Sequence, residues 1–327
     1  MKLSILIPVY NVASYLPSLL QELLPSLSKE IEIIFFDDAS PDDSVCIIEK
    51  YMALYPDACI RILRGNDNVG LTKARGILLN ASQAEYIWYI DSDDKIEGKF
   101  LKKIISILCH AKPDVLLFDY DVFFDQSNKI KHRETLSYHP ENTLVEMSAV
   151  DIYRTAVLDG KHYFWNKIFR RGLIDGVVCF DIPAFEDIAY TPILLSKCEN
   201  FYYFPEVVVH YRIRKDSIAQ KMGKFQLFGI KAYVQQAQYA LDVMHDAKSR
   251  AYLLYKSAIY YYRTLKKIHL SNLSDQEKND LVTMSRQFYQ DKKISEWIIV
   301  SLLMQQGMYS KAVKLLFCIL IANIKFN

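Results

Sequence analysis

The 327 residues are enough for one large α/β domain with a smaller appendage, and half of them are hydrophobic (51%), which excludes an intrinsically disordered chain. The formal net charge is only +2, and we expect no nucleic-acid partner. The charge is unevenly spread, since residues 225–327 carry 14 basic and 7 acidic residues, against 26 and 31 in the first 224. An acidic body followed by a basic region makes an anionic surface a candidate partner of the C-terminal part.

The cysteines and the apolar runs indicate the cellular compartment of the protein. The six cysteines are scattered and form no C-x-x-C pair, which is typical of buried thiols in a reducing compartment and disfavours a metal site built on cysteine. The apolar N-terminal stretch is too short for a signal peptide, and no apolar run reaches the roughly 18–20 residues that a transmembrane helix needs. We therefore expect a cytoplasmic protein, with a possible peripheral position on the inner face of the cell membrane.

Strand and helix signals alternate over the first 120 residues. Five short apolar runs, rich in β-branched or aromatic residues, predict strands that are buried on both faces of a mainly parallel sheet. They span residues 3–9, 32–37, 60–63, 86–90 and 115–120. Three segments with helical periodicity lie between them, at residues 14–24, 44–55 and 72–81, where Pro25 should end the first and Thr72 should cap the third. This alternation predicts a Rossmann-like layered α/β domain.

The rest of the chain is expected to be less regular and then helical. The polar stretch after Asp121 predicts a hairpin or a loop, and residues 145–220 mix helix and short-strand signals. From about residue 225 onward the chain has helical periodicity throughout and contains no proline. We therefore expect an α/β domain over residues 1–224 and a helical C-terminal extension over residues 225–327.

A carboxylate cluster is the first candidate site. No G-x-G-x-x-G follows the first strand and no Walker loop is present, so a bound nucleotide would need a divalent cation to neutralise its phosphates. The strand at residues 86–90 runs directly into Asp91, Ser92, Asp93 and Asp94. Oxygen ligands at the end of a strand suit Mg²⁺ or Mn²⁺, which bind through one or two carboxylates and substrate phosphates. The alternative is an acidic turn in which Asp93 or Asp94 caps the next helix.

A second acidic pair, Asp37 and Asp38, ends the second predicted strand. A carboxylate at the carboxyl edge of an open sheet can accept the N3–H of uracil, which would select uridine. The alternative, compatible with the first interpretation, is that Asp38, Ser40 and Asp42 form a turn and cap the helix that starts near Ser44.

Four blocks carry a family resemblance. SILIPVYN, EIIFFDDASPDDS, NDNVGLTKARGILLNA and EYIWYIDSDD, in this order across residues 4–94, resemble the N-terminal half of the GT-A fold inverting glycosyltransferases of family two. The similarity continues through FWNKIFRR, FEDIAYTPILL and YRIRKDSIA and so covers about two thirds of the chain. It implies an enzyme that moves a hexosyl residue from a UDP-sugar to an acceptor hydroxyl on a glycan or lipid-linked glycan, in lipopolysaccharide, O-antigen or capsule synthesis, with Mn²⁺ or Mg²⁺ as cofactor.

The resemblance also implies roles for particular residues. Those expected to bind the nucleotide are Pro8, Tyr10, Asp38, Asn68, Arg75, Asp91, Ser92 and Arg212. Arg214 accompanies Arg212 in a basic loop that can close on the diphosphate. Asp93 is the implied direct metal ligand, with Asp91 beside it. The sequence departs from the family at Gly76, where asparagine is usual, and this weakens the local helix rather than the chemistry.

The acidic pair Glu186 and Asp187 is similar to the pair whose aspartate acts as general base in this family. A helix that begins near Glu186 would place both carboxylates where backbone N–H groups can orient them. A binding module has no need of a base, which argues against a non-catalytic nucleotide-sugar-binding subunit. A dehalogenase-type phosphotransferase is a weaker alternative, because it needs a nucleophilic aspartate on its first strand and this strand ends in PVYN.

Other candidates have plainer interpretations. We expect His210 to be an ordinary strand-end residue, and Trp165 to be either a core aromatic or a platform for the acceptor. Lys167 and Arg170 are expected to form only a solvated basic face.

Residues 297–327 contain two apolar segments, each shorter than a membrane span, with lysines interspersed. This pattern fits a pair of interfacial helices attracted to anionic lipid. The alternative is that the two helices pack on the catalytic domain or on a partner subunit.

Overall fold

The computed structural model describes residues 1–136, 140–146, 161–175, 182–214, 223–243, 246–291 and 294–325. They belong to two compact units, and each is described by itself. The first unit takes its described residues from 1–149, 163–181 and 197–215. The second takes them from 150–162, 182–196 and 216–327.

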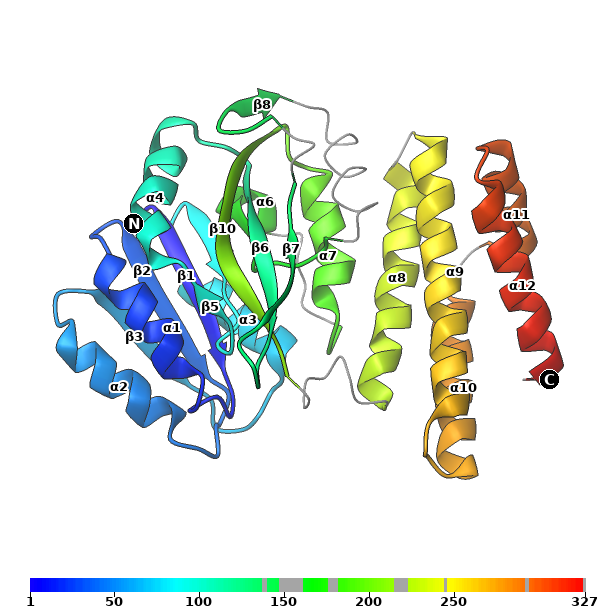
Figure 1. Cartoon of the computed structure of the whole chain (residues 1–327), viewed down its shortest axis with the longest axis horizontal. Coiled ribbons are helices and arrows are strands. Elements are labelled where there is room, and N and C mark those ends of the chain that lie inside the picture. Colours follow the sequence, from blue (N-terminus) through cyan, green and yellow to red (C-terminus); the bar gives the residue numbers. More distant parts are fainter. Residues whose placement is uncertain are drawn as a thin grey trace. The chain divides into compact units, whose positions relative to one another are not determined.

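The first unit contains a sheet with the strand order β3-β2-β1-β4-β9-β6-β10-β5 (Figure 1). Four parallel strands form one side: β1 (Leu3–Val9), β2 (Ile31–Asp37), β3 (Cys59–Arg64) and β4 (Tyr86–Tyr89). The other side holds the long parallel pair β6 (Val115–Phe124) and β10 (Asn200–Ile213). The predicted mainly parallel α/β sheet is therefore confirmed.

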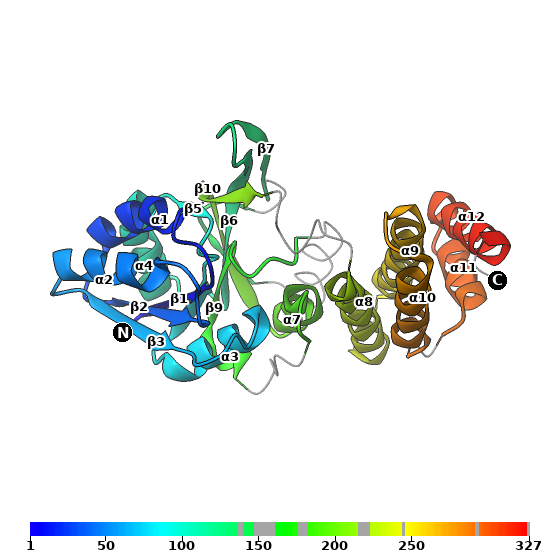
Figure 2. The same cartoon turned by 90° about the horizontal axis from the view of Figure 1, so that it is seen from below.

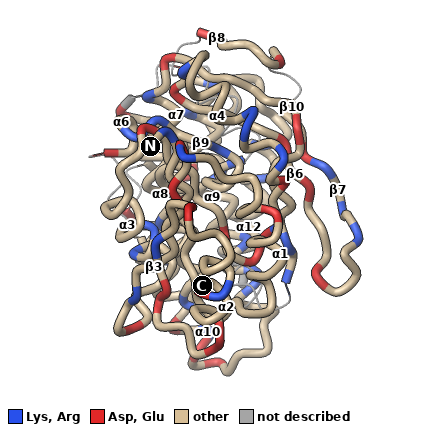
Figure 3. The backbone as a smooth tube through the Cα atoms, turned by 90° about the vertical axis from the view of Figure 1, so that its left-hand side faces the viewer, with Lys and Arg blue, Asp and Glu red and all other residues tan. Residues whose placement is uncertain are grey.

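Short antiparallel strands complete the sheet. The strand β9 (Lys167–Arg170) lies between β4 and β6 and is antiparallel to both, so β6 and β10 run in the same direction as β1 to β4. The strand β5 (Lys95–Ile96) pairs with β10, as does β8 (Leu144–Glu146). Of the hairpin or loop expected after Asp121, the structure has the hairpin, because β7 (Ile130–Glu134) returns antiparallel to β6. This strand contains basic residues (Figure 3), and they are exposed.

Helices cover both faces of this sheet. Figure 2 shows α1 (Leu16–Leu23), α2 (Ser44–Leu54) and α4 (Leu101–His110) on one face and α3 (Leu71–Ala81) on the other. The three predicted helices are confirmed. The short elements η1 (Leu24–Ser26), η2 (Gly98–Phe100) and α6 (Arg171–Ile174) complete the unit.

One predicted helix end is confirmed and one was wrong. The helix α1 ends at Leu23 with Leu24 as its C-cap, so it stops directly before Pro25, which lies in the short turn η1. Thr72 does not cap the third helix; it is buried inside α3, and Gly70 occupies the cap position with a φ of 86°. A glycine adopts this left-handed conformation without steric cost, whereas threonine would be strained there.

The strands are apolar because both faces of the sheet are covered. Trp88 of β4 is fully buried, packs edge-to-face on Phe118 of β6 with ring centroids 5.5 Å apart, and donates from its indole N–H to the carbonyl of Trp165 (2.8 Å). The rings of Trp88 and Trp165 are both buried, and both residues belong to the hydrophobic core. Of its two interpretations, the core aromatic is the one that the structure supports.

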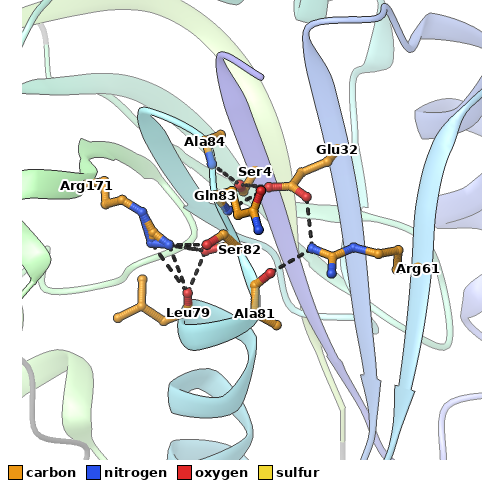
Figure 4. A network of polar contacts seen from close by, with 9 residues as sticks. All are labelled: Ser4, Glu32, Arg61, Leu79, Ala81, Ser82, Gln83, Ala84 and Arg171. Carbon is orange, nitrogen blue, oxygen red and sulfur yellow. Dashed lines mark hydrogen bonds and ion pairs between the residues drawn. The ribbon is translucent and has the colours of Figure 1, made fainter.

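At the amino-terminal edge of the sheet, a buried carboxylate connects the strands (Figure 4). Glu32 of β2 accepts the hydroxyl of Ser4 (2.5 Å) and the backbone N–H of Gln83 (3.0 Å), and it pairs with Arg61 of β3 (3.0 Å). Arg61 also donates to the carbonyl of Ala81 at the end of α3 (2.7 Å). These bonds fix the connection from α3 into β4, the strand that leads to the acidic cluster.

The second unit is helical. Its helices are α7 (Glu186–Leu195), α8 (Lys224–Val243), α9 (Ala247–Leu270), α10 (Asp275–Gln290), α11 (Glu296–Gln305) and α12 (Tyr309–Lys325). Side chains cap three of them: Asp246 caps α9, Ser295 caps α11, and Ser274 and Glu277 form a capping box at α10. The predicted helical C-terminal extension is confirmed. Within the described residues, no helix combines the length and apolar character needed to cross a bilayer.

Candidate functional site

Polar side chains gather at the carboxyl edge of the sheet in the first unit. Pro8 is the buried penultimate residue of β1, and Tyr10, just beyond this strand, is 47% exposed. Asp38 follows β2 and donates its backbone N–H to the carbonyl of Val9 (2.9 Å). The acidic cluster follows β4, and Arg212 lies near the end of β10. Ligands of open α/β sheets bind at this edge, so the fold brings most of the predicted nucleotide site together.

Asp38 is buried and holds the loop that precedes α3. Its Oδ1 accepts the backbone N–H of Val69 (2.6 Å), and its Oδ2 accepts that of Gly70 (2.9 Å). Asn68, one residue earlier, is exposed. A carboxylate has about four lone-pair sites, so both oxygens of Asp38 retain acceptor capacity for one further donor.

Arg75 connects α3 to the acidic cluster. Its guanidinium is buried and donates to Oδ1 of Asp91 (2.6 Å). The rings of Tyr89 and Phe164 lie 5.9 and 5.7 Å from it, and the hydroxyl of Tyr89 donates to the backbone carbonyl of Arg75 (3.2 Å). A charged hydrogen bond of this kind, enclosed by aromatic rings, fixes the orientation of the Asp91 carboxylate.

The end of β10 binds the loop of residues 91–94. The backbone N–H of Arg212 donates to Oδ1 of Asp94 (2.8 Å), and its side-chain Nε donates to the backbone carbonyl of Asp93 (2.6 Å). Arg214 forms an ion pair with Oδ2 of Asp93 (2.7 Å). Both guanidinium groups lie over the ring of Tyr15, at 4.9 and 5.3 Å from its centroid.

The carboxylates of Asp91, Asp93 and Asp94 repel one another. Burial raises the pKa of Asp94 well above its usual value, and the charges of Asp93 and Asp91 raise it further. Burial also raises the pKa of Asp93, as does the charge of Asp91, although Arg214 and Arg212 oppose this. Added positive charge at this position would relieve the repulsion between the carboxylates.

The residues fit a hard divalent cation. The side chains of Asp91 and Asp93 are 24% and 19% exposed, so each can reach a ligand, whereas Asp94 is buried and accepts the Arg212 N–H. Asp94 therefore does not cap the next helix, although the alternative interpretation had proposed this role for Asp93 or Asp94. Among the described residues, no group of three or more His, Cys, Asp or Glu side chains forms a complete metal cage. Two carboxylates with substrate phosphates are the usual ligand set of Mg²⁺ or Mn²⁺ at such sites.

Ser92 is buried between the two partly exposed aspartates. The sequence did not single out Tyr15 or Asp125, yet both contact the arginines: Asp125 Oδ1 accepts from Nη1 of Arg212 (2.8 Å). Asp125 immediately follows β6, so its place after a strand was the available signal.

The prediction of a solvated basic face was wrong for Lys167. Its side chain is only 1% exposed, and its Nζ donates to the carbonyl of Tyr163 (2.9 Å) and to Oδ1 of Asn166 (2.7 Å). Burial of the lysine is tolerated because its ammonium donors are engaged by oxygens. Arg170 is partly exposed and pairs with Asp114 (3.5 Å).

His210 lies within β10, close to the end of the strand. Among the described residues, it is part of no group of three or more side chains that could hold a metal ion. Its Nε2 is 3.1 Å from Oε1 of Glu97, and its Nδ1 is 3.6 Å from Oδ2 of Asp121.

The acidic pair belongs to the second unit, where α7 begins at Glu186 as expected. Phe185 precedes it with a φ of 64°, an uncommon conformation for a bulky residue that is found at functional positions. Glu186 is buried, and Asp187 is half-buried with its Oδ1 accepting the backbone N–H of Ile188 (2.8 Å). Burial together with the charge of Asp187 raises the pKa of Tyr260, on α9, to about 12.

Comparisons with known proteins identify the family of this chain. The family model described as glycosyl transferase family 2 matches residues 4–170, just over half of the chain. A putative glycosyltransferase, EpsH of Bacillus subtilis (strain 168), is 26% identical over 245 residues, which are 72% of this chain and 68% of EpsH.

Two solved structures share the fold. The crystal structure of S. aureus TarS 1-349 in complex with UDP-GlcNAc has a TM-score of 0.67 and 19% identity and covers 96% of this chain and 89% of TarS 1-349. The mannosyltransferase PcManGT from Pyrobaculum calidifontis, in complex with GDP-Man and Mn²⁺, has a TM-score of 0.51 and 13% identity and covers 100% and 88%.

The fold and the acidic edge of the sheet define a GT-A type transferase. The chain belongs to glycosyl transferase family 2.

Proposed function

We propose that this chain transfers a hexosyl residue from a UDP-sugar to an acceptor hydroxyl, with inversion at the anomeric carbon. The observation that carries the proposal is the clustering of Asp38, Arg75, Asp91, Asp93 and Arg212 at the carboxyl edge of the sheet. TarS and PcManGT, which share the fold, each have a solved structure in complex with a nucleotide sugar, which supports a nucleotide sugar as the donor.

Uridine selection is assigned to Asp38, whose carboxylate can accept the N3–H of uracil while it retains the N–H groups of Val69 and Gly70. Pro8 and Tyr10 would line the uridine pocket. Asn68 and Ser92 are assigned to the nucleotide site on family resemblance.

Asp91 and Asp93 would hold Mg²⁺ or Mn²⁺, which supplies positive charge to the leaving diphosphate. Arg75 keeps the Asp91 carboxylate in place. Arg212 and Arg214 already contact residues 93 and 94, and they would add positive charge beside the diphosphate as it leaves.

Asp187 is proposed as the general base. It would take the proton of the acceptor hydroxyl, the acceptor oxygen would form the new bond to the anomeric carbon, and the bond from that carbon to the diphosphate would break, so that UDP leaves with the electron pair. Asp91 and Asp93 are poor candidates for this role, since they pair with arginines and would bind the cation. Glu186 stands beside Asp187 as the second acidic residue of the pair.

The acceptor is proposed to be a glycan or lipid-linked glycan of lipopolysaccharide, O-antigen or capsule. We assign the transfer reaction to residues 1–224, which include Glu186 and Asp187. The helical region of residues 225–327 is assigned a supporting role. We propose a cytoplasmic setting, in keeping with the scattered cysteines of the sequence.

The test is release of UDP from a panel of UDP-sugars, measured with Mn²⁺, with Mg²⁺ and with EDTA. We expect turnover of at least one UDP-sugar with a metal and none with EDTA. Turnover of phosphate monoesters, with every UDP-sugar left intact, would instead favour the phosphotransferase alternative.

A further inference from the structure

The α11–α12 hairpin presents large apolar side chains to solvent. We define its outer apolar face by Trp297, Ile298 and Met304 of α11 and by Val313, Phe317, Leu320 and Ile321 of α12, all of which are exposed. Phe317, for example, is 64% exposed. The two helices lie side by side at the end of the helical unit (Figure 1).

On α12 these residues form a stripe, since positions 313, 317, 320 and 321 repeat at helical spacing. On α11, Trp297 and Met304 lie seven residues apart on one side of the helix, with the exposed Ser301 between them. A different set of side chains packs into the helical core: Ile299, Leu303, Ala312, Leu315 and Ile319. The helix α12 is thus apolar on two sides, and the packing of the described residues uses only one of them. A surface helix normally carries polar residues on the side away from its core, so the outer face needs a separate explanation.

Basic side chains accompany this face. Arg263 and Lys266 of α9 and Lys314 of α12 are exposed, and α9 packs against α12. The charges of these three side chains oppose the increase that burial causes in the pKa of the Cys318 thiol on α12. Glu296 is the only acidic residue in the sequence from residue 294 onward. The hairpin therefore combines exposed apolar area with local positive charge.

We propose that the outer apolar face lies on an anionic lipid surface, with Val313 and Phe317 in the headgroup region and Arg263, Lys266 and Lys314 at lipid phosphates. Interfacial helices bind through such a combination, and each basic residue near an anionic membrane adds to the attraction. A second copy of the chain is a poorer match. A symmetric pair built on this face would bring the same basic residues together, and like charges would oppose it.

The experiment measures binding of the full chain to vesicles without donor or acceptor. Vesicles of phosphatidylcholine with an equal part of phosphatidylglycerol are compared with pure phosphatidylcholine vesicles by flotation at low and high salt. We expect binding to the anionic vesicles only, weakened at high salt. Val313→Ser with Phe317→Ser should lower the partition coefficient about tenfold or more, and Lys314→Gln should lower it about fivefold.

The matched control is Leu54→Ser with Phe124→Ser, which removes two exposed apolar side chains of the first unit and should leave binding unchanged. Circular dichroism checks that each variant is folded. Equal flotation of the Val313/Phe317 double variant and the parent protein would overturn the proposal. So would a dimer, seen by light scattering, that this double variant abolishes, because a second copy would then cover the face. Since no sugar is transferred in this assay, its failure would leave the proposed transferase reaction untouched.

Discussion

At the scale of single residues, the acidic cluster is held by arginines from distant parts of the sequence. Asp91 is paired with Arg75 of α3, and Asp93 with Arg214, which follows β10. The sequence predicted the carboxylates, because they directly follow an apolar strand. It could not predict that Arg214 faces Asp93, since that depends on the pairing of β10 with β6 and β5.

Asp93→Ala is expected to abolish transfer while the protein stays folded. The side chain lies at the surface of the site and makes one partly exposed ion pair, so its loss should change the free energy of unfolding by about 1 kcal/mol or less. UDP release and thermal unfolding are measured on the same sample. Glu49→Ala, which removes an exposed ion pair with Arg64 on the first unit, serves as the control and should remain active. Full activity of Asp93→Ala in EDTA would refute the assignment.

Asp187→Asn should lower kcat by about 10²–10⁴-fold and leave UDP affinity unchanged, because removing a general base affects the chemical step and not donor binding. Turnover and UDP titration are measured separately, and Glu186→Gln is made in parallel. Loss of UDP binding in Asp187→Asn would move this residue to the nucleotide site. A normal kcat would mean that the base lies elsewhere, with Glu186 as the next residue to examine.

At the scale of elements, the network around Glu32 predicts a pH-dependent stability. Burial of Glu32 opposes its ionisation, but the hydroxyl of Ser4, the N–H of Gln83 and the guanidinium of Arg61 together lower its pKa. A carboxyl group with a lowered pKa in the folded state stabilises the protein above its unfolded-state pKa, about 4.3, and this contribution is lost as the pH falls through the folded-state pKa.

Glu32→Gln should therefore lower the free energy of unfolding by about 1–2 kcal/mol at pH 7, and the difference should shrink below about pH 4. Urea unfolding of the two proteins across this pH range provides the measurement. A difference that stays constant from pH 7 down to pH 3 would contradict the assigned role of the ionised carboxylate.

Gly98 of η2 allows α1 to approach, because a Cβ at this position would collide with the backbone carbonyl of Glu22. Gly98→Ala should therefore be destabilising by about 1–3 kcal/mol, with a lower Tm. The control is Gly172→Ala in α6, where an added Cβ meets no atom within 4 Å. In a helix this control substitution should be neutral or slightly stabilising. An equal Tm for both variants would argue against the close approach of η2 and α1.

Element types were more predictable than their pairing. Apolar runs predicted the strands β1 to β4 and β6, because both faces of the sheet are covered. The insertion of β9 between β4 and β6 could not be inferred, since a short strand of four residues carries little periodicity. The same insertion explains why the predicted solvent exposure of Lys167 was wrong. This lysine is buried because β9 lies inside the sheet.

At the scale of the whole molecule, a GT-A sheet unit and a helical unit make up one chain of glycosyl transferase family 2. The family and the class of fold were within reach of the sequence, because the motifs occur in order at the ends of predicted strands. The outer apolar face was only partly predictable. Sequence alone showed two apolar helices, and the structure was needed to tell the packed side chains from the exposed ones.

The proposed donor site is tested most directly by titrating the protein with UDP, with and without Mn²⁺, by calorimetry. We predict binding of UDP that depends on Mn²⁺ and is lost in Asp93→Ala, together with weaker binding of CDP and GDP, because we propose that Asp38 accepts the N3–H of uracil. Absence of UDP binding in the presence of Mn²⁺, or equal affinity for all three diphosphates, would contradict the proposed site.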